Sequence, residues 1–302
     1  MPAAQILVSA ASLLPRRRGA LIFAYHDITL ELLRSHTRLV AAAFHIVTMG
    51  EIVTRLVAGR SLEGLAAFTF DDGWRSFAAA ATWFQANRWP VLCYLPTRIL
   101  EQDGGSLWFA ELEELAQQPG FGRVAYRGCE LDGRTGRRLR RSVEVLAESL
   151  CHVPADEACE LVRGLARCAG VRLSGARRFL DAEFVARHAS DPWVRFGSHG
   201  VSHQSLASLD DAAAEAELAM SRSRLEALLT YPVEHYCYPY GGDAHLGPAA
   251  RARVGRCYAS AVTMRRGVVV PGTDPLVLPR IPIYARDHAA RLALKIATAP
   301  WR

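Results

Sequence analysis

The chain has 302 residues, half of them hydrophobic, and a formal net charge of +6 that arginine carries almost alone. A chain of this length can bury a large core, either as one α/β domain or as two smaller ones. No apolar run is long enough to cross a bilayer, which argues against a membrane-spanning helix. The sequence shows neither a nucleic-acid-binding motif nor a basic stripe interleaved with aromatic residues, so we expect no nucleic-acid partner.

The N-terminal segment and the cysteines bear on the cellular compartment. Residues 3–15 are apolar and are followed by Arg16, Arg17 and Arg18. A secretory signal carries its positive charge before the apolar stretch, so the reversed order here predicts a short amphipathic lead-in helix. The seven cysteines are odd in number and form no Cys-x-x-Cys motif, which favours free thiols over a disulfide framework or a cysteine zinc site. Together these features predict a reducing, cytoplasmic setting.

Strand-like and helix-like segments alternate over the first hundred residues. We expect strands at residues 21–27, 46–49, 65–70 and 90–95, and helical spacing at residues 39–44, 51–58 and 75–87. Such alternation predicts a mostly parallel sheet or barrel.

The rhythm changes between Pro96 and about Leu180. Helical periodicity recurs at residues 108–116, 139–151 and 155–168, whereas the Gly- and Arg-rich residues 120–136 favour a loop or a short strand. We interpret residues 97–180 as a mainly helical insertion that caps the site, with a small separate domain as the alternative. Its basic cluster predicts either a solvated surface or attraction to an anionic membrane or a phosphate-linked substrate. This arginine cluster comprises Arg134, Arg137, Arg138, Arg140 and Arg141.

The alternation resumes after the insertion. Strands are predicted at residues 193–198, 233–238, 257–263 and 277–283, and helices at residues 181–188, 210–229, 248–254 and 287–298. Asp210 has the position and chemistry of an N-cap. Without an internal repeat or a low-complexity linker, the pattern predicts a single domain over residues 1–302.

Two adjacent acids stand where the apolar strand at residues 65–70 ends. Adjacent strand residues point to opposite faces, so Asp71 and Asp72 should have different roles, and Gly73 lets the backbone turn. One carboxylate can bind a metal while the other handles a proton. The alternative is an ordinary Asp-Asp-Gly turn.

Two histidines follow the strand at residues 193–198. In a helical turn the spacing of His199 and His203 puts both imidazoles on one face. With Asp72 as a third ligand they would form an open metal site, and Asp71 would be the general base. The alternative is a pair of surface histidines at the start of a helix.

Three motifs in this order resemble the polysaccharide deacetylases, carbohydrate esterase family four. They are Thr69-Phe70-Asp71-Asp72-Gly73, His199-x-x-x-His203 and Tyr238-Pro239-Tyr240-Gly241. The resemblance covers roughly residues 21–99 and 181–283. It implies a distorted (β/α) barrel and one divalent ion, for which zinc is expected. In that family the metal serves to remove N- or O-acetyl groups from sugars. The resemblance also implies that Asp71 is the base, that Asp72, His199 and His203 bind the metal, and that the backbone of Tyr240 stabilises an oxyanion.

The chain departs from this family in two places. Gly200 stands where the family usually has Ser or Thr, and the C-terminal Leu-x-His that supplies the general acid is absent. Tyr25-His26 and Leu278-Pro279-Arg280-Ile281 instead resemble the permuted branch that deacetylates poly-N-acetylglucosamine. That resemblance implies that His26 is the general acid and that Arg280 pairs with Asp71.

Alternatives accompany several of these assignments. His26 could be a core histidine, and His288, at the start of a helix, is a rival for the acid role. Trp74 and Trp108 are candidate sugar platforms or core residues.

The sequence therefore predicts a metal-dependent carbohydrate N-deacetylase, cytoplasmic or peripheral at the inner membrane face. Its substrate would be an N-acetylated sugar in a glycan or in a lipid- or nucleotide-linked precursor. An O-acetyl esterase using the same site is the nearest alternative, and a non-catalytic glycan-binding module is the alternative from another class.

Overall fold

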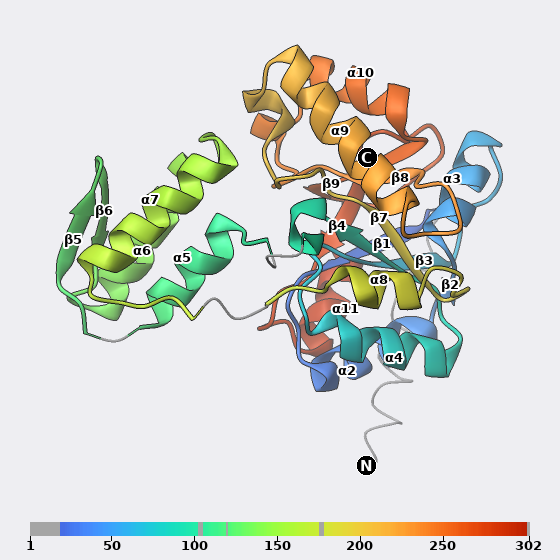
Figure 1. Cartoon of the computed structure of the whole chain (residues 1–302). Coiled ribbons are helices and arrows are strands. Elements are labelled where there is room, and N and C mark those ends of the chain that lie inside the picture. The colour runs from blue at the N-terminus through green and yellow to red at the C-terminus, as the bar shows by residue number, and fades with distance from the viewer. Residues whose placement is uncertain (1–18, 102–104, 119, 175–177, 301–302) are drawn as a thin grey trace, which may run out of the picture.

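The computed structural model describes residues 19–101, 105–118, 120–174 and 178–300, so the lead-in helix predicted at residues 3–15 and the arginines that follow it lie outside these residues. Parallel strands form a closed ring, because β1 (Leu21–Tyr25) pairs with both β3 (Leu65–Phe70) and β10 (Leu278–Pro282). The ring continues from β3 through β4 (Val91–Leu95), β7 (Val194–Ser198), β8 (His235–Cys237) and β9 (Ser260–Arg266). The short β2 (His45–Ile46) lies outside the ring beside β3. The predicted barrel is confirmed (Figure 1).

The barrel strands are apolar along their whole length because both of their faces are covered. Every residue of β1, β3 and β4 is buried, as expected for parallel strands beneath helices. On β3, Phe68 and Phe70 face outward, where Phe84 of a covering helix packs against both rings. Thr69 and Asp71 have the opposite orientation and contact Arg280 inside the barrel.

Helices cover the outside of the barrel. They are α2 (Leu30–Ala41), α3 (Met49–Val57), α4 (Phe77–Asn87), α8 (Ala182–Arg187), α9 (Asp211–Glu226), α10 (Pro248–Cys257) and α11 (Ala289–Ala297). Side-chain caps fix several of their starts: Thr29 caps α2 and Thr48 caps α3. Asp210 caps α9, which confirms the predicted N-cap. Over the part of the chain that the structure describes, none of the helices combines the length and apolarity needed to span a membrane.

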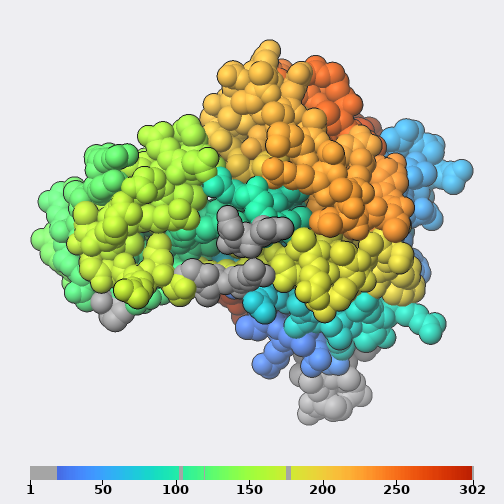
Figure 2. Space-filling view, in the orientation of Figure 1, coloured from blue at the N-terminus to red at the C-terminus, as the bar shows by residue number. Residues whose placement is uncertain are grey.

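Between β4 and α8 the chain forms a lobe beside the barrel, which we call the insertion lobe (Figure 1). It comprises α5 (Trp108–Gln117), β5 (Arg123–Tyr126), β6 (Cys129–Asp132), α6 (Gly136–Leu150) and α7 (Ala155–Cys168). The lobe has its own hydrophobic cluster, which includes Leu112, Leu131 and Leu165. The Gly- and Arg-rich stretch between its helices is a hairpin, because β5 and β6 pair antiparallel. In Figure 2 the lime surface of the lobe lies beside the gold surface of the barrel side.

Three predicted elements are placed differently in the structure. The helical spacing at residues 39–44 belongs to the end of α2, which begins earlier because Thr29 caps it. The strand predicted at residues 46–49 is cut short, since Thr48 caps α3 from Met49 onward. The strand predicted at residues 257–263 is β9, which begins later because Cys257 still belongs to α10.

Candidate active site

The carboxyl ends of the barrel strands surround a cavity of about 690 Å³. Residues from both sides of the molecule line it. The barrel supplies His26, Asp71, Asp72, His199, His203, Tyr238, Tyr240, Gly242, His245 and Met264, and the insertion lobe supplies Trp108, Phe109, Glu144, Ala147, Glu148 and Cys151. The lobe therefore forms one wall of the cavity. Since loops at this edge of parallel strands commonly carry active sites, the cavity is the natural candidate.

Asp71 is held by a buried guanidinium. Nη1 and Nη2 of Arg280 donate to its two carboxylate oxygens at 2.8 and 2.7 Å, and the arginine is fully buried. Nε of Arg280 donates to the Thr263 carbonyl at 2.9 Å, and Nη1 also reaches Oγ1 of Thr69 at 3.1 Å. Burial alone would raise the pKa of Asp71, but the charge and hydrogen bonds of Arg280 lower it. Asp71 is thus an oriented carboxylate that stays ionised.

Asp72 faces different partners because the backbone turns at this point. Its φ is +68° and that of Gly73 is +70°. A Cβ at Gly73 would lie 2.5 Å from a methyl group of Leu95, and the positive φ also disfavours other residues, so glycine suits this position. Oδ2 of Asp72 accepts a hydrogen bond from Nε1 of Trp74 at 3.0 Å. Oδ1 lies 3.4 Å from Nε2 of His199 and 3.3 Å from Nε2 of His203.

These three donor atoms fit a divalent cation. Oδ1 of Asp72 is buried and has no hydrogen-bond partner among the described residues, which is costly unless an ion or water binds there. One carboxylate and two imidazoles are a ligand set typical of zinc and related ions. Nδ1 of His199 lies 2.7 Å from the Cys237 carbonyl, which orients the ring and leaves Nε2 facing Asp72.

The ionisation of the cluster also favours a cation. Burial would raise the pKa of Asp72, but the imidazoles of His199 and His203 lower it well below its usual value. Burial lowers the pKa of His203, which favours the neutral imidazole that binds metals. At His199 the contacts with Cys237 and Asp72 outweigh burial and raise the pKa. The cluster therefore stabilises positive charge between these side chains.

The two histidines lie on a loop, so the helical turn that their spacing suggested is wrong. Gly200 has a φ of +80° and His203 a φ of +61°, neither of which an α-helix allows. Glu217 of α9 organises this loop. Its carboxylate accepts from the backbone N–H of Val201 at 2.6 Å and of Ser202 at 3.1 Å, and from the Ser202 hydroxyl at 2.6 Å.

Glu217 also accounts for the glycine in this motif. A Cβ at Gly200 would come within 2.8 Å of Oε2 of Glu217. The carboxylate therefore occupies the space beside the loop that a longer residue would need. A side chain far along the sequence orders the histidine loop here, and the motif itself gives no sign of it.

His26 follows β1 and lines the cavity. Its Nε2 lies 3.7 Å from Oδ2 of Asp71, and its side chain is 38% exposed. A fully buried core histidine is therefore excluded. His288, the rival for the acid role, is exposed at the start of α11 and does not line the cavity.

Tyr240 also lines the cavity. Its φ is +62°, and its N–H donates no hydrogen bond to another described residue. Its ring packs edge-on against His203, with the centroids 4.8 Å apart. The oxyanion role expected of Tyr240 would need an N–H without another partner, so it stays a prediction that this backbone group is compatible with.

The two tryptophans differ in position. Trp74 is 8% exposed, packs against Phe109 and Phe179, and does not line the cavity. As a sugar platform it is a wrong assignment, because its indole is part of the core and its N–H orients Asp72. Trp108 is buried but does line the cavity, where it remains a candidate for sugar contact.

The arginine cluster lies away from the cavity. Its residues occupy the loop before α6 and the first turns of that helix, and they are exposed. The later turns of α6 face the cavity with Glu144 and Glu148 instead. Among the described residues that line the cavity, none is Lys or Arg. The cavity wall is therefore acidic, and the expected contact between these arginines and a phosphate inside it is not supported.

Comparisons with known proteins agree with the fold and the motifs. Residues 172–253 match the family model of polysaccharide deacetylase. No curated protein matches the chain. Among solved structures, IcaB from Ammonifex degensii has a TM-score of 0.59 and 16% identity, with 94% of this chain and 99% of that chain covered.

Two further solved structures give similar values. The Streptococcus pyogenes deacetylase PplD, in complex with acetate, has a TM-score of 0.59 and 12% identity, with 92% of this chain and 97% of that chain covered. BC0361, a polysaccharide deacetylase from Bacillus cereus, has a TM-score of 0.58 and 14% identity, with 92% and 69% covered. Residues 172–253 thus match the polysaccharide deacetylase family by sequence, and more than nine-tenths of the chain has the fold of solved polysaccharide deacetylase structures, as the motifs predicted.

Proposed function

We propose that this protein is a metal-dependent deacetylase that removes the N-acetyl group from an N-acetylated sugar. The observation that supports this most is the buried, unpartnered Oδ1 of Asp72, which faces Nε2 of both His199 and His203. A divalent ion, with zinc expected, would be held by these three atoms. When bound, it would act as a Lewis acid that polarises the acetyl carbonyl and lowers the pKa of a water.

The chain's own residues divide the proton transfers between them. Asp71 is ionised and oriented by Arg280, so it can take a proton from the attacking water. The backbone N–H of Tyr240 can donate to the carbonyl oxygen as negative charge develops on it. His26 borders the cavity and can give a proton to the leaving nitrogen. An amide nitrogen needs that proton, because an unprotonated amine is a poor leaving group.

The charge of the cavity wall restricts the class of substrate that we propose. With Glu144 and Glu148 in the wall and no Lys or Arg among its described lining residues, the cavity favours a neutral or cationic sugar over a phosphate group. We therefore rank an N-acetylated glycan above a nucleotide- or lipid-diphosphate-linked sugar. Any phosphate of a linked precursor would have to remain outside the cavity.

Acetate release tests this proposal. Purified protein with added Zn²⁺ would be assayed on N-acetylglucosamine oligomers, a nucleotide-linked N-acetyl sugar and an O-acetylated sugar. We expect release from the oligomers above all, with loss of activity after chelation and in the Asp72→Asn variant. Release only from the O-acetyl substrate would identify an esterase, and oligomer binding without any release would identify a glycan-binding module.

A peripheral membrane contact is a separate part of the proposal. The exposed arginine cluster on α6 could meet an anionic lipid surface while the far end of the same helix lines the cavity. Co-sedimentation with vesicles containing phosphatidylglycerol would test it. Binding should fall when Arg137 and Arg141 are changed to Glu, and unchanged binding would assign the cluster to solvation alone.

A further inference from the structure

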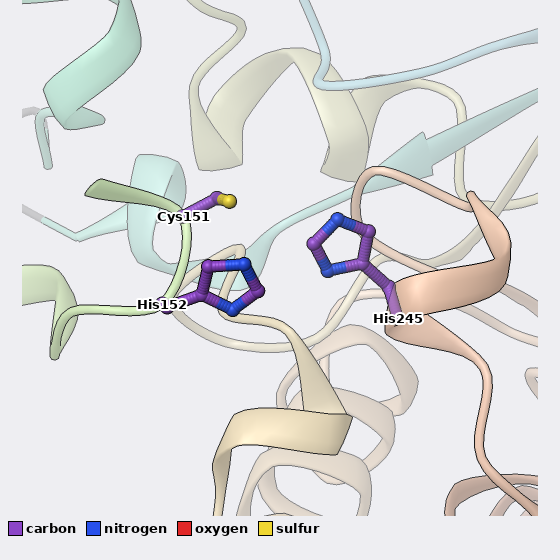
Figure 3. A group of neighbouring side chains, drawn as sticks. All are labelled: Cys151, His152 and His245. Atoms are coloured by element: carbon purple, nitrogen blue, oxygen red, sulfur yellow. The ribbon is translucent and has the colours of Figure 1, made fainter. Parts of the chain in front are cut away.

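A second group of metal-binding side chains lies at the junction between the insertion lobe and the barrel. Cys151 is the C-cap of α6 and His152 follows it, and His245 ends the short helix η3 (Asp243–His245) of the barrel side. Their ligand atoms all lie within 4.8 Å of one another. Figure 3 shows the three side chains directed toward a common space from these two parts of the chain. We propose that they form a second metal site, of the soft Cys-His-His type that suits Zn²⁺, which links the lobe to the barrel.

His245 is prepared for this role by its neighbours. Its Nδ1 lies 2.9 Å from Oγ of Ser205, which is fully buried, so Nε2 is left for a ligand. A hydrogen bond on the other ring nitrogen is the usual way that a metal-binding histidine is oriented. Burial and the neighbouring His152 lower the pKa of His245, which favours the neutral form that metals require.

Cys151 and His152 complete the set from the lobe. The thiol of Cys151 is buried and borders the cavity, and burial raises its pKa, so the metal would replace the thiol proton, which passes to solvent. The rings of His152 and His245 are nearly parallel, with centroids 5.4 Å apart. Ligand atoms around tetrahedral zinc are roughly 3.4 to 3.6 Å apart for normal bond lengths. The ligand atoms here lie up to 4.8 Å apart, so they must approach one another when a metal binds. Because His152 is exposed, rotation of its side chain can bring its ring nitrogen closer to the other two ligand atoms.

The fourth ligand position would face the cavity. A water from the cavity, which Cys151 and His245 both line, can complete the tetrahedron. This ligand set shares no residue with the Asp72, His199 and His203 cluster. The inference therefore stands apart from the proposed function.

The position of this site suggests what it does. The ring of Tyr240 packs against the rings of both His203 and His245, with centroid distances of 4.8 and 4.9 Å. A metal at His245 would fix the wall that supports Tyr240. It would also hold the lobe against the barrel at the cavity edge.

Cobalt is a sharp probe, because of the two proposed ligand sets only the second includes a cysteine, whereas Cys237 beside His199 belongs to neither. Titration of the full-length protein with Co²⁺ should produce a thiolate-to-cobalt charge-transfer band in the near ultraviolet. Cys151→Ser should abolish this band, and His152→Ala should weaken cobalt binding while leaving the fold intact, since that residue is exposed. Ser205→Ala keeps every ligand and should reduce affinity roughly 10- to 100-fold, as loss of an orienting partner does.

Two controls separate this site from the catalytic one. Cys168→Ser removes an exposed cysteine of α7 and should leave the band unchanged. The Asp72→Asn variant should keep the band, and Zn²⁺ should still raise the melting temperature of this variant. Zn²⁺ should not raise the melting temperature of the Asp72→Asn/His152→Ala double variant. Absence of the band in the unmodified protein, or its persistence in Cys151→Ser, would overturn the second site whatever the outcome of the deacetylase assay.

Discussion

Asp71 and Asp72 are neighbours in sequence, yet each is bound by a different set of partners. Arg280 holds Asp71 from inside the barrel, whereas Trp74 and the two histidines surround Asp72. The turn at Asp72 and Gly73 separates the two carboxylates. The chemistry of the pair therefore depends on backbone geometry as much as on residue type.

Asp71→Asn should separate proton transfer from metal binding. The amide can still accept from Arg280 but cannot take a proton, so kcat should fall by at least about 10²-fold. Zinc content, measured by elemental analysis, should match that of the unmodified protein. Loss of the metal with activity restored at high zinc would mean that the two acids have exchanged roles.

His26→Ala tests the general acid. The half-buried imidazole lies 3.7 Å from Asp71 and borders the cavity, so its removal should leave the metal ligands in place. An ester alkoxide leaves more readily than an amine, and the variant should therefore nearly lose N-deacetylation while retaining hydrolysis of an activated acetyl ester. His288→Ala, at an exposed position outside the cavity, is the matched control. Equal loss on both substrates would remove His26 from the acid role.

For individual site residues, the sequence predicts which of them lie together, but not all of the residues that they contact. Short motifs after strands placed Asp72, His199 and His203 together, because parallel strands end at one edge. Trp74 was misjudged, since an exposed platform and a buried donor look alike in sequence. Glu217 was missed, because nothing in the pattern of a surface helix marks one glutamate as the partner of a distant loop.

Among the elements, α9 and the loop between β7 and α9 act as one unit. The loop carries both histidines with positive φ values at two positions, and Glu217 receives three of its hydrogen bonds. The loop geometry therefore depends on a helix that supplies no metal ligand. The prediction of a helical turn from the His-x-x-x-His spacing was wrong for this reason, because the spacing carries no information about Glu217.

Glu217→Gln should loosen this unit. The amide keeps the size of the side chain but loses the charge that attracts three donors, so metal affinity should fall roughly 10- to 100-fold. Competition with a zinc chelator would measure the change. Glu215→Gln, at an exposed position of the same helix, is the matched control and should bind zinc normally. Equal affinities for both variants would show that the loop is stable without Glu217.

At the scale of the whole molecule, the barrel interior is organised around an ion pair. Arg280 is fully buried, spans from β10 to β3 and contacts Thr263 of β9 through its Nε. The barrel itself could be predicted from the strand–helix alternation and the motif order. The sequence also suggested that the insertion caps the site, but not which of its helix faces line the cavity, because periodicity identifies helices without saying which face meets which neighbour.

Stability against pH is the whole-molecule test of that ion pair. In the folded protein the pKa of Asp71 is below its usual value, so its stabilising contribution is complete at neutral pH. The contribution should be lost as the pH falls below about 4, the usual carboxyl range, toward the lower folded pKa. Arg280→Met leaves the buried Asp71 carboxylate without its guanidinium partner, which should cost about 3 to 5 kcal/mol at pH 7.

In the Arg280→Met variant the pKa of Asp71 should be raised and not lowered. Without Arg280, burial raises the pKa of Asp71, and protonation relieves the penalty as the pH falls. The difference in unfolding free energy between the two proteins should therefore narrow as the pH falls from 7 to about 4.5. This range stays above the usual carboxyl pKa of about 4, so the unmodified protein keeps the contribution of Asp71 while the carboxylate of the variant becomes protonated. Urea unfolding with chelator present, so that metal release does not contribute, would measure it. Arg265→Met removes an exposed partner of Asp243 and should change stability little at either pH. A difference that stays constant with pH would show that Arg280 stabilises the barrel by packing, and not through the charge of Asp71.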